Sequence, residues 1–76
     1  MADSKVAVIS GASSGIGLCT AAALCGDGYT VFDLSRSGHD HDGIIHIDCD
    51  VTDEEMIASA VGEIVSRAGR IDVVIN

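Results

Sequence analysis

Residues 10–17 read Ser10-Gly11-Ala12-Ser13-Ser14-Gly15-Ile16-Gly17, and they separate an aliphatic run from a Pro-free stretch rich in Ala and Leu. The run before them, Val6 to Ile9, is typical of a short buried strand. The stretch after them, Ile16 to Cys25, is typical of a helix that ends at the glycines which follow it. Proteins bind pyrophosphate groups at glycine-rich turns between a strand and a helix, so this segment predicts a phosphate-binding turn.

The glycines of this turn are spaced for three separate tasks. Gly11 permits the tight turn out of the strand, Gly15 lets the backbone approach a pyrophosphate, and Gly17 lets the helix pack close to the sheet. Free N–H groups at the start of the helix point outward at its positive end, where an anion binds. Ser13 and Ser14 can add hydroxyl donors. The alternative is a turn that only reverses the chain; a nucleoside-triphosphate loop is disfavoured because no Lys follows the last glycine.

The rest of the chain alternates between strand and helix patterns. Aliphatic and β-branched runs predict three further strands, at Thr30 to Leu34, Ile44 to Ile47 and Ile71 to Ile75. The polar, glycine-flanked stretch from Ser35 to Gly43 predicts a loop. It is shorter than the crossover of about a dozen residues that joins consecutive parallel strands. Either a compact loop crosses over or the second and third strands pair antiparallel, and we expect the compact loop.

The clearest predicted element is a helix that ends at Gly69. Thr52 is followed three residues later by Glu55, which matches a capping box with Thr52 as the N-cap. Acidic residues fill the first turn and Arg67 lies in the last, as the helix dipole favours. Apolar residues recur at helical spacing and predict one buried stripe, made of Met56, Ile57, Ala60, Val61, Ile64, Val65 and Ala68.

The order strand, helix, strand, strand, helix, strand predicts an α/β fold with a Rossmann-like parallel sheet and flanking helices. The 76 residues suffice for one domain at most, and we expect a truncated one. Ser10, Arg36, Asp50 and Asn76 all fall at or just beyond the C-terminal ends of predicted strands. Open α/β sheets bind ligands at that edge, which supports a ligand site there.

The composition excludes several classes of protein. Hydrophobic residues make up 47% of the chain, too many for a disordered segment, and aromatic residues only 3%, so aliphatic side chains must form the core. Twelve acidic residues against four basic ones give a net charge of −8, which argues against nucleic-acid or membrane partners. No apolar run approaches the ~20 residues of a membrane span.

The cysteines and histidines are interpreted as non-catalytic. Cys19, Cys25 and Cys49 show no CxxC spacing, so we expect reduced thiols in a cytoplasmic protein. His39-Asp40-His41-Asp42 contains metal-ligating residue types, but a solvated loop is the expected state and no metal site is predicted. His46 alternates with isoleucines and is expected to be a packed or hydrogen-bonded strand residue.

Three segments together resemble the short-chain dehydrogenase/reductase family, in its single-domain branch that depends on a Tyr and a Lys. They are the Gly-x-x-x-Gly-Ile-Gly spacing of residues 11–17, Asp50-Val51-Thr52-Asp53, and Gly69-Arg70-Ile71-Asp72-Val73-Val74-Ile75-Asn76. The resemblance covers nearly the whole chain. It departs from the family at Ser10, where Thr is commoner, and in the short loop, where many members carry a further helix. It implies that residues 1–76 are the N-terminal part of one NAD(P)-binding Rossmann domain.

The resemblance also implies a function for the intact protein. Family members are oxidoreductases that transfer hydride between NAD(P)(H) and a carbonyl or alcohol, so we expect a small-molecule substrate and a homo-oligomer. Asp50 would accept a hydrogen bond from the adenine amino group, with Val51 against the ring and Asn76 near the cofactor. The contacts to the phosphates and the adenosine ribose would come from Gly11, Ser13, Gly15, Ile16 and Gly17.

The residues after the second strand bear on the choice between NADP and NAD. Ser35 stands where the family usually has the acid that binds the ribose 2′-hydroxyl of NAD, and Arg36 can accommodate the 2′-phosphate of NADP. Asp33 is the rival, because by alternation it shares a face with Ser35. We therefore expect NADP as the cofactor, with NAD as the alternative. A solvated loop cation is the alternative interpretation of Arg36.

The family's catalytic residues have no counterpart in this chain. In the family, a Tyr, a Lys four residues later and a Ser act on the carbonyl. The only tyrosine here is Tyr29, and Asp33 follows it by four residues. We expect Tyr29 to be packed, no catalytic residue within the chain, and the 76-residue chain alone to be inactive. The alternative function is a non-catalytic dinucleotide-binding or interaction module.

Overall fold

The computed structural model describes residues 4–11, 15–36, 40 and 43–75. Along the chain come β1 (Val6–Ser10), α1 (Gly15–Gly26), β2 (Thr30–Ser35), β3 (Ile44–Asp48), α2 (Glu54–Ala68) and β4 (Val73–Ile75). This is the predicted order of strands and helices, which is confirmed, and most ends differ from the prediction by one residue or two. No helix in the described part of the chain is long and apolar enough to cross a membrane.

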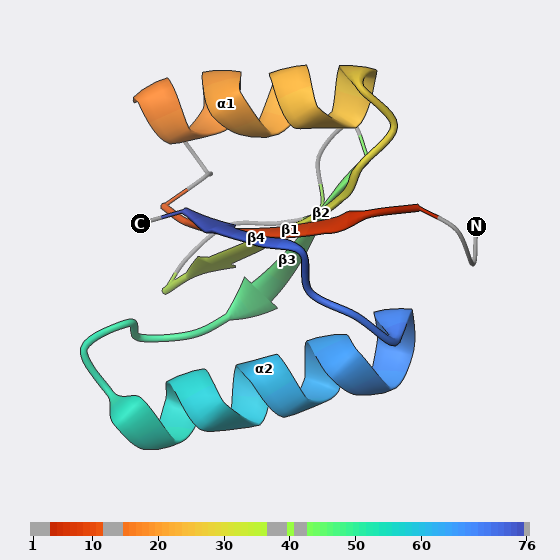
Figure 1. The fold of residues 1–76 in the computed structure, drawn as a ribbon. Coiled ribbons are helices and arrows are strands. Elements are labelled where there is room, and N and C mark those ends of the chain that lie inside the picture. Colours follow the sequence, from red (N-terminus) through yellow and green to blue (C-terminus); the bar gives the residue numbers. More distant parts are fainter. Residues whose placement is uncertain (1–3, 12–14, 37–39, 41–42, 76) are drawn as a thin grey trace.

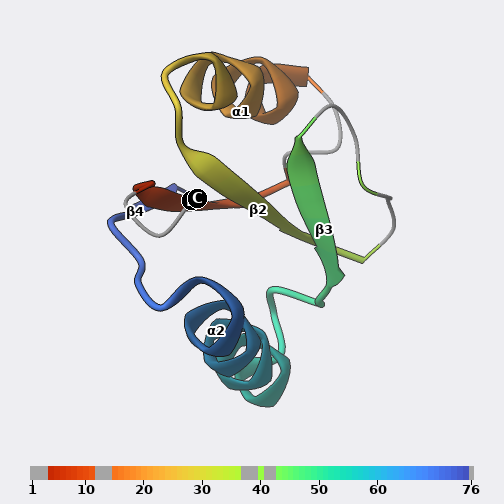
Figure 2. The same ribbon diagram turned by 90° about the vertical axis from the view of Figure 1, so that its right-hand side faces the viewer.

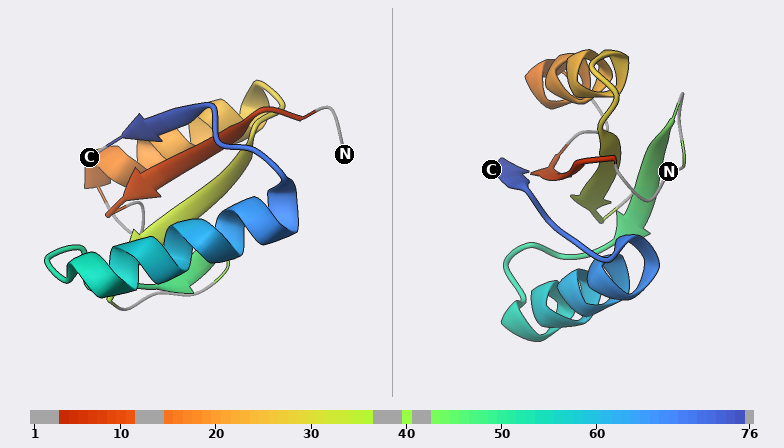
Figure 3. Two further views of the ribbon diagram at one scale, coloured as in Figure 1. Left: turned by 60° about the horizontal axis from the view of Figure 1, so that its bottom comes forward. Right: turned by 45° about the vertical axis from the view of Figure 1, so that its right-hand side comes forward.

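The four strands form one parallel sheet in the order β3-β2-β1-β4. The predicted compact crossover between β2 and β3 is confirmed, since these strands pair parallel. The molecule has three layers, with α1 on one face of the sheet and α2 on the other (Figures 1 and 2). β1 lies between β2 and β4, and β4 forms one edge of the sheet (Figure 3). The expected Rossmann-like arrangement is therefore present.

Each helix covers its own apolar cluster. The cluster beneath α1 is small and consists of Ala7, Ile9, Ala21, Val31 and Ile44. The cluster beneath α2 is larger and consists of Val6, Val8, Phe32, Leu34, Ile47, Cys49, Ala60 and Ile64. Alternate residues of each strand point to opposite faces, so both faces of the central strands are buried, as in other sheets covered on both sides.

The apolar stripe of α2 is only half buried. Ala60 and Ile64 are buried in the cluster beneath α2, and Ile57 and Ala68 pack against that cluster. Three other apolar residues of the predicted stripe remain exposed, namely Met56, Val61 and Val65. The helical spacing was right, but the apolar arc is wider than the sheet surface that covers it.

Helix α2 does not begin with the predicted capping box. Its N-cap is Asp53, whose Oδ1 accepts hydrogen bonds from the N–H groups of Glu55 (3.0 Å) and Met56 (3.2 Å). The Thr52 hydroxyl instead donates to Asp50 Oδ1 at 2.6 Å. The prediction of Thr52 as N-cap was wrong because Asp is an equally good cap and Asp50 binds the Thr52 hydroxyl.

The C-terminal end of α2 is as predicted. Gly69 adopts the left-handed conformation, with φ of 80°, and its N–H donates to the Val65 carbonyl at 2.8 Å. Glycine is favoured at this position because it lacks the Cβ that makes left-handed backbone costly.

Strand β4 begins two residues later than predicted, because Asp72 bonds to β1 in a different way. Its N–H donates to the Val6 carbonyl at 2.8 Å, and its carboxylate accepts from the Val6 N–H at 2.7 Å. Arg70 donates two further bonds to the same carboxylate, at 2.9 and 2.6 Å. The bonds from Arg70 and Val6 lower the pKa of Asp72. Ile71 lies outside the strand and packs against the cluster beneath α2.

Replacing the observed N-cap is expected to destabilise the protein. Asp53→Ala removes the acceptor of two otherwise unpaired helix N–H groups and lowers the free energy of unfolding by about 0.5–2 kcal/mol. Asp53→Asn keeps an acceptor at the same place and retains most of that free energy. Urea denaturation of both variants measures the difference. Equal stability of the Ala and Asn variants would contradict this assignment of the cap.

Candidate functional site

A cleft of about 290 Å³ lies at the C-terminal ends of the strands. Parallel strands all leave the sheet at the same edge, so the residues that follow β1, β2 and β3 are brought together there. The lining residues are Gly11, Leu34, Ser35, Arg36, Cys49, Asp50, Val51 and Thr52. Five residues predicted to bind the cofactor therefore line one cleft, although they lie up to 40 positions apart in the sequence (51 − 11).

Two glycines flank the segment that joins β1 to α1 beside this cleft. Gly11 and Gly15 both have positive φ, of 78° and 62°, which L side chains rarely adopt. A Cβ built at Gly15 would meet no atom of the described residues within 4 Å, and Ile16 is 87% exposed. The described residues therefore leave space at the positive end of α1, where the first N–H groups of a helix have no partner within the helix. Gly17 lies in the first turn of α1. The predicted residues Ser13, Ser14 and Asn76 lie outside the described residues.

Asp50 and its neighbours form a hydrogen-bonded wall of the cleft. Asp50 Oδ1 accepts hydrogen bonds from the Thr52 hydroxyl at 2.6 Å and the Thr52 N–H at 2.9 Å. These bonds, and the positive charge of Arg36, lower the pKa of Asp50, so the carboxyl is charged at neutral pH. Val51 is 45% exposed at the cleft. A fixed acceptor beside an exposed aliphatic surface suits a flat ring with an amino group.

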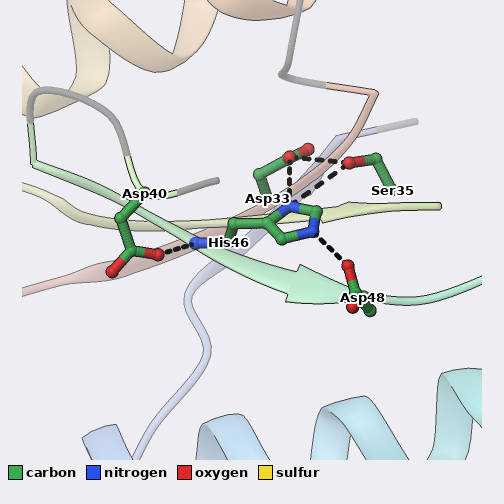
Figure 4. Close-up of polar contacts among 5 residues, drawn as sticks. All are labelled: Asp33, Ser35, Asp40, His46 and Asp48. Atoms are coloured by element: carbon green, nitrogen blue, oxygen red, sulfur yellow. Dashed lines mark hydrogen bonds and ion pairs between the residues drawn. The ribbon is translucent and has the colours of Figure 1, made fainter. Parts of the chain in front are cut away.

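Asp33 lies inside the sheet rather than at the surface. The residue is 2% exposed, and its Oδ2 accepts a hydrogen bond from the Ser35 hydroxyl at 2.9 Å. The same oxygen lies 3.0 Å from His46 Nδ1. Alternation does place Asp33 and Ser35 on one face of β2, as expected (Figure 4). Only Ser35 of the two lines the cleft.

His46 joins Asp33 to a second acid. Its Nε2 lies 2.6 Å from Asp48 Oδ1. The main-chain N–H of His46 donates a hydrogen bond to Asp40 Oδ1 at 2.8 Å (Figure 4). Burial lowers the pKa of His46, but the hydrogen bonds and charges of Asp33 and Asp48 outweigh it and raise the pKa above its ordinary value. The prediction of a hydrogen-bonded strand histidine is confirmed.

The partners of His46 were not identified from the sequence. The signal was the register, since β2 and β3 pair Asp33 with His46 and Ser35 with Asp48. Reading that register requires knowing that the two strands pair parallel and at which residue they start.

Tyr29 and Cys49 both pack in the apolar clusters of the sheet. Tyr29 packs against the cluster beneath α1, as predicted. Cys49 lines the cleft but is 1% exposed, and burial raises the pKa of its thiol. Within residues 4–11, 15–36, 40 and 43–75, no three His, Cys, Asp or Glu side chains group as metal ligands would. His39, His41 and Asp42 of the polar loop lie outside the described residues.

Comparison with known proteins gives consistent matches. The family profile described as short chain dehydrogenase matches residues 5–76. Momilactone A synthase of Oryza sativa is 41% identical over 83 aligned positions, which cover 95% of this chain and 30% of that protein. The chain thus spans about a third or less of such relatives.

Solved structures are similar in the same way. Ligand-free aldohexose dehydrogenase of Thermoplasma acidophilum superposes with a TM-score of 0.89 at 33% identity, over 99% of this chain and 30% of that one. The 3-ketoacyl-(acyl-carrier-protein) reductase of Brucella melitensis, in complex with NADH, superposes with a TM-score of 0.81 at 27% identity. That match covers 92% of this chain and 32% of the reductase.

The carboxylates of Asp33 and Asp48 are expected to stabilise the protonated form of the His46 imidazole. An NMR titration of the imidazole should give a pKa above the ordinary value of about 6.5. Asp33→Asn, which removes the buried carboxylate, should lower that pKa. Because the folded-state pKa is raised, the stabilisation by His46 is complete below about pH 6.5 and is lost as the pH rises through the folded-state pKa. An imidazole that titrates at or below pH 6.5 would contradict the hydrogen-bonding scheme.

Proposed function

The chain belongs to the short chain dehydrogenase family, and we propose that it binds the adenosine and diphosphate parts of an NAD(P) cofactor. The chain accounts for about 30% of the length of its relatives, and we propose that it is the N-terminal part of one NAD(P)-binding domain. The intact protein would be an oxidoreductase that transfers hydride between this cofactor and the carbonyl or alcohol group of a small molecule.

The observation that carries the proposal is the start of α1 at Gly15, which the described residues leave uncovered beside the cleft. A Cβ built at Gly15 would meet no atom of the described residues within 4 Å, and polar residues that follow β2 and β3 line the neighbouring cleft. A diphosphate is an anion, and main-chain donors at a helix N-terminus bind anions without any basic side chain. This mode of binding suits a chain with a net charge of −8. Ser13 and Ser14 would add hydroxyl donors.

The far end of the cleft suits the adenosine. Asp50 would accept a hydrogen bond from the adenine amino group, and Val51 would lie against the ring. The lowered pKa of Asp50 supports this role, since a charged carboxylate is a strong acceptor. Asn76 would lie near the cofactor at the end of β4.

We infer NADP rather than NAD from the residues at the end of β2. Ser35 and Arg36 line the cleft, and a guanidinium binds a phosphate through two parallel hydrogen bonds. The rival for the ribose was Asp33. Asp33 is buried and contacts Ser35 and His46, which supports a structural role for its carboxylate and not a hydrogen bond to the ribose.

The nicotinamide of the bound cofactor supplies the hydride. This chain would hold the other end of the cofactor and would contribute no proton donor, because Tyr29 is packed beneath α1. We therefore propose that the 76-residue chain alone has no dehydrogenase activity, and that the intact protein works as a homo-oligomer.

Removal of Arg36 is expected to weaken NADPH binding selectively. Arg36→Ala removes a charge-assisted contact worth about 1.5–3 kcal/mol, so the Kd for NADPH should rise roughly 10- to 100-fold. The Kd for NADH should stay within about twofold, because its 2′-hydroxyl carries no charge. Fluorescence titration of the protein with each cofactor measures both values. The control is Lys5→Ala, which lies just before the N-terminal end of β1 and so at the end of the strand away from the cleft. It should change neither Kd. An equal loss for both cofactors would refute the selection of NADP by Arg36.

Substitution of Gly15 is expected to weaken the binding of both NADPH and NADH. Gly15→Val places a branched side chain where the diphosphate would bind and strains a backbone with φ of 62°, so both Kd values should rise about tenfold or more. Gly62→Ala in α2, another glycine with open space around it, is the control and should leave both unchanged. Circular dichroism establishes that the variants remain folded. Unaltered affinities in folded Gly15→Val would contradict the proposed diphosphate site.

A further inference from the structure

Asp50 and Thr52 form a hydrogen-bonded pair in the wall of the cleft. The Thr52 hydroxyl and the Thr52 N–H both donate to the same oxygen, Asp50 Oδ1, at 2.6 and 2.9 Å. The main-chain carbonyl of Asp50 accepts a further hydrogen bond from the Asp53 N–H at 2.9 Å. Asp50 and Thr52 both line the cleft. The carboxylate and the main chain of Asp50 are therefore both held by the residues that follow it.

The two bonds from Thr52 leave one oxygen of the carboxylate for a ligand. An ionised carboxylate has about four lone-pair sites, two on each oxygen. Oδ1 directs both of its sites to Thr52, whereas Oδ2 accepts no hydrogen bond from the described residues. The Thr52 hydroxyl contributes most to lowering the pKa of Asp50, so at neutral pH the carboxyl carries no proton. Oδ2 can therefore accept a hydrogen bond but cannot donate one.

An oxygen that only accepts distinguishes purines by the group on their sixth ring atom. Adenine carries an amino group there, which donates a hydrogen bond, whereas hypoxanthine and guanine carry a carbonyl, which accepts one. A carboxylate oxygen attracts the amino group and repels the carbonyl. The 6-oxo purines also carry an N–H beside the carbonyl, and a carboxylate that could turn would be able to accept it. A carboxylate held through Oδ1 has less freedom to turn.

The Thr52 hydroxyl is not required for the start of α2. The N-cap of that helix is Asp53, whose own carboxylate accepts the first helical N–H groups. Thr52 is exposed and precedes the cap. Removal of the hydroxyl therefore changes how Asp50 is held without removing the contact that caps the helix.

We propose that Thr52 is a positioning residue, which holds Asp50 through Oδ1 so that Oδ2 faces the base and the cleft selects adenine over 6-oxo purines. The inference rests on the proposed function, because it needs the base of the cofactor at Asp50. It adds a residue that acts through Asp50 and need not touch the amino group itself. It also fixes the sign of the selection, since a donor on the base is accepted and an acceptor is rejected.

The test compares NADPH with the analogue in which hypoxanthine replaces adenine, so that the two ligands differ only in the purine. Fluorescence titration of the intact protein gives a Kd for each ligand, and the quantity of interest is their ratio. The wild-type protein should bind NADPH at least about tenfold more tightly, because the analogue places a carbonyl against an ionised carboxylate.

Two variants of Thr52 separate positioning from a general effect on the cleft. Thr52→Val keeps the shape of the side chain but removes the hydroxyl, and should reduce the preference for NADPH to about threefold or less. Thr52→Ser keeps the hydroxyl and should retain the wild-type preference. Thr30→Val, the same substitution at the N-terminal end of β2, is the matched control and should leave the ratio unchanged.

A measurement without cofactor checks the hydrogen bond itself. The pKa of Asp50, followed by NMR, should rise in Thr52→Val and stay low in Thr52→Ser, because only the serine hydroxyl still stabilises the charged carboxylate. An unchanged pKa in Thr52→Val would contradict the contact on which the inference depends.

Asp50→Asn should reverse the selection, because the two donors of Thr52 determine how the new amide is oriented. They bind its oxygen, so that its NH₂ group faces the base. The hypoxanthine analogue should then bind more tightly than NADPH. In the double variant D50N/T52V only the Thr52 main-chain N–H remains to orient the amide, and the reversal should be weaker.

The outcomes separate the role of Thr52 from the proposed function. Thr52→Val with the wild-type ratio, an equal loss of both ligands in Thr52→Val, or an Asp50→Asn variant that binds both ligands equally would overturn the role of Thr52. If Thr52→Val does not fold, the reversal in Asp50→Asn decides the question. If the wild-type protein binds neither ligand saturably, the proposed function fails and the inference fails with it. Tight NADPH binding without preference over the analogue would leave cofactor binding standing and remove only the selection at Asp50 and Thr52.

Discussion

The parallel pairing of β1 with both β2 and β4 is the constraint on which the rest of the structure depends. Because these strands run in one direction, the chain leaves each of them at the same edge, and the next segment has to cross back over a face of the sheet. The glycine turn after β1, the Ser35-Arg36 corner after β2 and the Asp50 turn after β3 are therefore neighbours in space. The cleft results from the topology, and the residue types in it determine what it binds.

The same constraint explains how an acidic chain can hold an anion. The net charge is −8, and the described contacts of Arg67 and Arg70 are with Glu63 and Asp72, away from the cleft. Attraction for the proposed diphosphate would therefore come from main-chain N–H groups, from serine hydroxyls and from Arg36, the basic side chain that lines the cleft. Such donors act over a short range, so the distribution of charge over the whole molecule matters less than the space that the described residues leave beside Gly15.

The sequence predicted the elements that follow from periodicity and from glycine. The parallel sheet, the compact crossover, the end of α2 at Gly69 and the group of residues at the strand ends were all foreseeable, since each depends on a local pattern or on topology. The start of α2 was misassigned because Thr52 and Asp53 are both good caps, and only the position of Asp50 decides between them. The start of β4 was misassigned because the aliphatic pattern begins at Ile71, whereas the strand begins only after Asp72, whose carboxylate binds the Val6 N–H. The contact of Asp33 with His46 depends on register, which hydrophobic pattern alone does not specify for strands buried on both faces.

The most direct test of the account is an amide NMR titration of the isotope-labelled protein with NADPH. The account predicts that the N–H resonances of Gly15 and Ile16 shift saturably, with the same Kd as that obtained from cofactor fluorescence, because these groups bind the diphosphate. Saturable binding that leaves the amides of the turn between β1 and α1 unshifted would contradict it.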